Sequence, residues 1–104
     1  MDNSGMVSSL DIVGYAAKTE ELKAELLSCL ADVFKDTAMG SRVIVQESRF
    51  ANLSELLLVL ANRCGMDLEL LLKEICSHAR SGVVKNDAFS GDHKAVIELM
   101  NAHR

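Results

Sequence analysis

The chain contains no proline and no tryptophan among its 104 residues. Proline is the residue that most strongly interrupts helical hydrogen bonds, so a proline-free chain rich in leucine, alanine, glutamate and lysine favours helices. The longest apolar run, Leu56–Ala61, is far shorter than the roughly 20 residues that a membrane-spanning helix needs. The first residues carry neither a basic region nor a long apolar stretch. We therefore expect no secretory signal, no membrane association and a cytoplasmic location.

Side chains suited to metal binding are few and widely spaced. Cys29, Cys64 and Cys76 make an odd count and sit among apolar neighbours, which is typical of buried, reduced thiols. Cys64 and Cys76 together with His78 and His93 form the one set that could hold zinc, and it lacks the short ligand spacings of zinc sites. The sequence predicts no metal.

Catalytic motifs are also missing. No Gly-Xaa-Ser-Xaa-Gly turn and no phosphate-loop glycine pattern occurs. Cys76 and His78 are two residues apart, which places them about 200° apart around a helix and prevents a local catalytic pair. We therefore expect no catalytic residues, no cofactor and no enzyme activity.

Length and composition indicate one globular domain. Apolar residues make up 49% of the chain and charged residues 25%, which are ordinary values for a folded protein. We expect a flexible tail over residues 1–6 and a single helical domain over residues 7–104. The formal net charge of −4 disfavours a nucleic-acid partner.

The first half of the chain predicts two helices. The first is short, begins after Ser8 or Ser9, and is weakened by Gly14. The second runs from about Glu20 to Met39, with Thr19 as its N-cap and Gly40 as its stop. Residues 41–51 predict a helical turn or an extended linker.

The second half predicts three more helices. One spans about Leu53 to Cys64, starts at a capping box of Asn52 and Glu55, and is apolar all round, which predicts a central position. The next spans residues 68–80, is capped by Asp67 and ends near Gly82. Residues 82–91 predict a polar loop, with Phe89 packed on the rest of the domain. The last helix begins after Ser90. The fold class is therefore all-α, a compact bundle of four to five short helices.

The helix over residues 20–39 carries two apolar stripes, although a surface helix needs only one. The first stripe is Leu22, Leu26, Cys29, Leu30 and Val33, and the second repeats every three and four residues, as a helix seam does. The second stripe, together with one leucine expected to be exposed on the helix over residues 68–80, is the candidate interface: Ala24, Leu27, Ala31, Phe34, Ala38 and Leu70. We expect a homodimer that buries this stripe. The alternative is a monomer in which neighbouring helices cover both stripes.

The segment Leu60–Asp67 resembles the turn region of helix-turn-helix DNA-binding domains. Ala61 matches the small residue between the helices, and Gly65 matches the turn glycine. The resemblance implies that the helices over 53–64 and 68–80 contact DNA, and residues 91–96 are similar to helices that follow such a motif in phage small terminase subunits. However, the helix that would read DNA begins with Asp67 and Glu69, which phosphates repel. It also lacks the Arg, Asn and Gln that usually read base edges.

The function that these patterns favour is a small, non-enzymatic protein-interaction or regulatory module, such as an adaptor, an inhibitor or a chaperone-like protein. It would bind a protein partner through apolar helix surface. The alternative is a degenerate helix-turn-helix protein, related to the phage proteins above.

Overall fold

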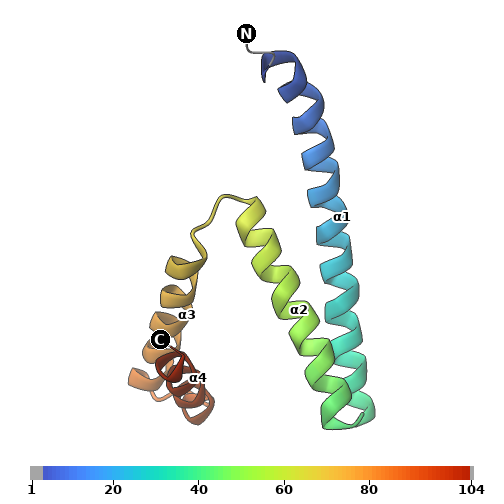
Figure 1. The fold of residues 1–104 in the computed structure, drawn as a ribbon. Helices are drawn as coiled ribbons and strands as arrows, with labels where there is room; N and C mark the ends of the chain where they lie inside the picture. The colour runs from blue at the N-terminus through green and yellow to red at the C-terminus, as the bar shows by residue number, and fades with distance from the viewer. Residues whose placement is uncertain (1–3, 104) are drawn as a thin grey trace. The chain divides into compact units, whose positions relative to one another are not determined.

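The computed structural model describes the backbone of residues 4–103 and the side chains of residues 12–103. Over this range the chain is all-helical, with four helices and no strand, which confirms the all-α prediction. The helices are α1 (Ser4–Met39), α2 (Val43–Arg63), α3 (Leu68–Val84) and α4 (Ser90–Ala102) (Figure 1). Part of the predicted tail, residues 1–3, lies outside the described residues.

The chain divides into two compact units, Met1–Cys64 and Gly65–Arg104. In the N-terminal unit α1 packs on α2, and in the C-terminal unit α3 packs on α4. Each unit is therefore a helical hairpin, and the prediction of one domain over residues 7–104 stays a prediction.

The prediction of two short helices before Gly40 was wrong, because α1 is one helix of 36 residues. Thr19, the expected N-cap, lies inside it, and its hydroxyl donates a 2.8 Å hydrogen bond to the Tyr15 carbonyl one turn earlier. Gly14 has nothing within 4 Å of its missing Cβ, so it weakens the helix without ending it.

The predicted stop of α1 at Gly40 is confirmed. Gly40 has φ +66°, a left-handed conformation that glycine adopts without steric cost. Its N–H donates to the Thr37 carbonyl (3.2 Å), and the Ser41 N–H donates to the Asp36 carbonyl (3.0 Å). These two bonds form the Schellman motif that closes a helix and reverses the chain.

The reading of residues 41–51 as a turn or linker was also wrong, because α2 begins at Val43. Asn52 lies inside α2 and caps nothing. Its side-chain amide instead donates to the Cys29 thiol of α1 at 3.2 Å. The expected central position of this helix was wrong as well, because Leu57 is 51% exposed. A two-helix unit covers only one side of each helix.

The predicted start of α3 is confirmed: the Asp67 carboxylate accepts hydrogen bonds from the N–H groups of Glu69 and Leu70. The predicted stop near Gly82 was wrong, since α3 continues to Val84. Gly82 is buried inside the helix, and a Cβ there would lie 2.3 Å from the His93 ring of α4. This glycine serves the close approach of α4 and does not end α3.

The turn between α3 and α4 is held by Asp87. One carboxylate oxygen accepts from the Phe89 N–H at 2.8 Å, and the other lies 3.1 Å from His93 Nε2. Phe89 is 63% exposed, so the prediction that it pins the loop to the body was wrong. The His93–Asp87 contact over Gly82 fastens the hairpin instead.

Gly82→Ala is expected to lower the free energy of unfolding by about 1–3 kcal/mol, because the added methyl must displace the His93 ring from Asp87. Urea denaturation followed by circular dichroism would measure it. Gly91→Ala is the matched control: Gly91 lies in α4 with nothing within 4 Å of the new methyl. This control should be neutral or stabilising. Equal effects of the two changes would contradict the proposed close approach.

Candidate functional site

The candidate site is the exposed apolar stripe of α1, formed by Ala24, Leu27, Ala31, Phe34 and Ala38 (hereafter the α1 stripe). All five residues are exposed, with Leu27 at 70% and Phe34 at 64%. At 3.6 residues per turn, the stripe centres about 150° around α1 from the side chains that pack on α2. The five α1 residues predicted as interface therefore share one exposed face.

The opposite side of α1 forms the core of the hairpin. Leu22, Leu26 and Val33 are buried, and Cys29 is half-buried between them. These are four of the five residues of the first predicted stripe, whereas the fifth, Leu30, is exposed. Leu53, Leu56 and Leu60 are half-buried on α2, the helix that packs on α1. Because α1 has one packed neighbour in its unit, one stripe is covered and the other stays at the surface.

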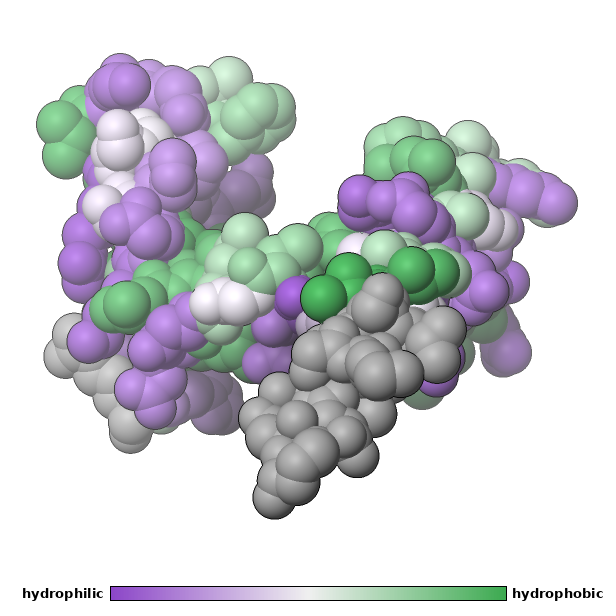
Figure 2. Space-filling view, turned by 90° about the horizontal axis from the view of Figure 1, so that it is seen from above, coloured by the Kyte–Doolittle hydropathy of each residue, from purple (hydrophilic) through white to green (hydrophobic). Residues whose placement is uncertain are grey.

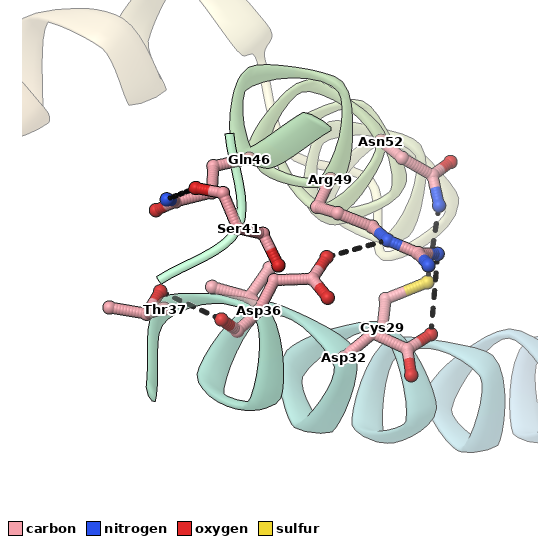
Figure 3. A network of polar contacts seen from close by, with 9 residues as sticks. Cys29, Asp32, Asp36, Thr37, Ser41, Gln46, Arg49 and Asn52 are labelled. Carbon is pink, nitrogen blue, oxygen red and sulfur yellow. Dashed lines mark hydrogen bonds and ion pairs between the residues drawn. The ribbon is translucent and has the colours of Figure 1, made fainter. Parts of the chain in front are cut away.

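One edge of the α1–α2 contact is polar (Figure 3). The Arg49 guanidinium of α2 donates to the Asp36 carboxylate at 2.9 Å, and a second nitrogen lies 3.6 Å from Asp32. Asn52 reaches Cys29 along the same edge. These contacts show that the Asp32 side of α1 and the Asn52 side of α2 lie at the same edge of the hairpin.

The other edge is apolar. Going around α1 from its buried side, Asp32 lies in one direction and Leu30 in the other. Around α2, Asn52 likewise lies in one direction, and Phe50 and Leu57 lie in the other. Since the Asp32 and Asn52 sides meet at the polar edge, Leu30, Phe50 and Leu57 share the opposite edge (hereafter the apolar edge). They are exposed by 36%, 51% and 51%, respectively.

The α1 stripe and the apolar edge are contiguous around the hairpin, because Leu30 lies between the buried side of α1 and Phe34. Hydrophobic side chains accordingly reach the surface among hydrophilic ones (Figure 2). Neither Phe50 nor Leu57 is among the interface residues that the sequence predicts, because Phe50 lies outside the predicted helices and Leu57 belongs to the helix that was expected to be central. Their spacing of seven residues, two helical turns, is the signal that places them on one face.

The charged groups beside the α1 stripe carry both signs. Glu21, Lys23 and Lys35 are all exposed. The Glu20 carboxylate accepts a 2.9 Å hydrogen bond from Lys23, and this contact raises the pKa of the Lys23 ammonium. A surface with mixed charge beside an apolar stripe suits a protein partner better than a polyphosphate.

Leu70, the sixth predicted interface residue, belongs to the other unit. It is 58% exposed and lines a small cleft of about 260 Å³ with Met66, Leu71 and Glu74. It therefore forms no part of the α1 stripe. A larger groove of about 740 Å³ lies elsewhere on α3 and α4, with Leu72, Cys76, Leu99 and Met100 among its lining residues and Glu69, Lys73, Arg80 and His103 around them.

The thiols are less uniform than the sequence predicted. Cys76 is buried and Cys29 is half-buried, but Cys64 is exposed, so its predicted burial was wrong. His78 is exposed and lies 4.0 Å from Glu74, on a different side of α3 from Cys76. Within the described part of the chain, no three metal-ligating side chains cluster.

Arg63, the basic residue within the segment that resembles a helix-turn-helix, is held by side chains and a carbonyl of α1. The Arg63 guanidinium lies 3.9 Å from the centre of the Tyr15 ring, donates to the Tyr15 carbonyl (2.8 Å) and donates to the Thr19 hydroxyl (3.0 Å). The Tyr15 hydroxyl in turn donates to the Arg63 carbonyl at 2.8 Å. The Arg63 side chain therefore joins α2 to α1, and a phosphate would compete with these contacts.

No protein-family model, curated protein sequence or solved structure matches the chain. Among the described residues, no helix combines the length and the apolar character needed to cross a bilayer. The assignment of a function therefore depends on the surface of the hairpin itself.

Leu26 and Leu27 are neighbours in α1, but one is buried against α2 and the other is exposed, so their substitution by alanine should affect stability differently. Leu26→Ala is expected to cost about 2–5 kcal/mol of unfolding free energy, because it removes buried side-chain volume. Leu27→Ala should change the stability of a single copy by no more than about 0.5 kcal/mol, since Leu27 is exposed. Urea denaturation at low protein concentration would compare them. A larger loss for Leu27 would mean that the α1 stripe is covered within one copy.

Proposed function

We propose that the chain is a non-enzymatic protein-interaction module that binds a protein helix through the α1 stripe and the adjoining apolar edge. The observation that carries the proposal is the exposure of Leu27 and Phe34 on a helix whose opposite side is already packed on α2. Two large apolar side chains seven residues apart recur on one face, which is the spacing that an amphipathic partner helix recognises.

The energetic argument rests on apolar area. Burying one leucine or phenylalanine side chain contributes roughly 1.5–3 kcal/mol. Leu27 and Phe34 are nearly central in the stripe, and Phe50 and Leu57 add further apolar area along the neighbouring edge. The three alanines of the α1 stripe, Ala24, Ala31 and Ala38, leave room for close approach of a helix backbone. A partner helix therefore gains apolar burial with little rearrangement of the hairpin.

A cytoplasmic location is part of the proposal. It is supported by the free thiols Cys29, Cys64 and Cys76, since unpaired cysteines suit a reducing compartment. With its thiols reduced, the α1–α2 hairpin has no disulfide among these cysteines. Its stability then comes from the apolar core between the two helices and from the polar contacts of Arg49 and Arg63.

A tagged copy of the chain is expected to retain a protein partner from an extract of its native cells, either another protein or a second copy of itself. Phe34→Glu should abolish this retention, because a charge would be buried without a partner in the interface. Asn62→Glu is the matched control, since it adds the same charge at an exposed position of α2 outside the α1 stripe and the apolar edge. Circular dichroism should show equal helix content. Full retention by the Phe34→Glu variant would refute the proposal.

A further inference from the structure

We infer that the helix bound by the α1 stripe is α1 of a second copy, running antiparallel, with a twofold axis that crosses α1 at the level of Cys29. This inference rests on the proposed function and specifies its partner. Three features of the exposed residues support it: the sizes of the stripe side chains, the charges beside them, and the residues that meet at the axis.

The sizes of the stripe side chains are complementary in an antiparallel pair. In an antiparallel pair of helices with a seven-residue repeat, the two kinds of seam position face each other. With the axis at residue 29, Phe34 faces Ala24 of the second copy, and Leu27 faces Ala31 of the second copy. Every large side chain in the centre of the seam thus meets an alanine, which allows an even distance between the two helices.

The flanking charges are complementary in the same register. In an antiparallel pair, equivalent flanking positions of the two helices face each other. Glu21 of one copy then lies opposite Lys35 of the other, and the twofold axis repeats this pair at the far end. Both side chains are exposed, and neither makes an ion pair within residues 12–103. They are therefore available to a partner.

The residues at the axis meet their own copies. Ser28 faces Ser28 of the second copy on one flank, and Leu30 faces Leu30 on the other. Leu30 is 36% exposed and belongs to the apolar edge, so its contact across the axis extends the apolar seam. On that flank Lys23 lies opposite Thr37, which creates no repulsion between like charges.

The contact between the two α1 helices ends at Glu20. This residue lies four residues before Ala24, continues the spacing of the α1 stripe and faces Ala38 of the second copy. Its carboxylate is already held by Lys23 at 2.9 Å. The carboxylate lies at the end of the contact, where water reaches it. The paired segment is therefore residues 20–38, about five helical turns.

A parallel pair lacks these features. It would stack Phe34 on Phe34 and Ala31 on Ala31, so the distance between the helices would have to change from layer to layer. Its flanking contacts would bring Lys23 to Ser28 and Leu30 to Lys35, without an ion pair. Size and charge both favour the antiparallel arrangement.

The test is the dimer dissociation constant of the full chain, measured by sedimentation equilibrium. The wild-type chain is expected to be a dimer, and Phe34→Glu a monomer of equal helix content. Glu21→Lys and Lys35→Glu should each weaken the dimer on the order of tenfold, because each turns two attractive pairs into repulsive ones. The Glu21→Lys, Lys35→Glu double variant restores both pairs with exchanged signs and should recover the wild-type constant. Glu25→Lys, an exposed charge reversal outside the seam, should have little effect.

The outcomes separate this inference from the proposed function. A wild-type chain that stays monomeric at high concentration overturns the inference, while loss of a different protein partner on Phe34→Glu would still support the proposed function. A dimer whose double charge variant is not restored overturns the antiparallel register. A dimer that survives Phe34→Glu overturns the assignment of the α1 stripe as the contact.

Discussion

The structure of the N-terminal unit depends on one constraint: α1 has two apolar stripes, and within this unit one helix, α2, packs on it. The stripe that includes Leu26 and Val33 is buried against α2, and the stripe that includes Leu27 and Phe34 is left at the surface. A two-helix hairpin has no third helix to cover the second stripe. The apolar surface that we assign to binding is therefore a direct consequence of how few helices the unit contains.

Polar side chains of α2 contact α1 at both ends of the hairpin. Arg49 binds Asp36 near the turn, and Arg63 stacks on Tyr15 near the open end, so two long cations of α2 hold α1 at well-separated levels. Exposed ion pairs contribute little to stability, so apolar burial between α1 and α2 supplies most of the stability of the hairpin. Because the Arg49 contacts lie at one edge, Phe50 and Leu57 lie at the opposite edge, beside the α1 stripe.

The errors of sequence interpretation have a common cause. Thr19 and Asn52 were read as caps, and Gly82 as a stop, because these residue types are common at helix ends. Inside the structure Thr19 and Asn52 bond to a carbonyl and to a thiol, and Gly82 accommodates the His93 ring. Local preferences of this kind are worth about 1 kcal/mol, which tertiary contacts readily outweigh.

Residue patterns alone predicted that the described chain is helical, that α1 stops before Gly40 and α3 starts after Asp67, and that two apolar stripes run along residues 20–39. These properties follow from periodicity and from backbone conformations that only a few residues adopt. Which stripe is buried, and that Phe50 and Leu57 extend the exposed one, follows from how α1 packs on α2. Burial depends on which helices pack together, and both stripes of α1 have the periodicity of a core face.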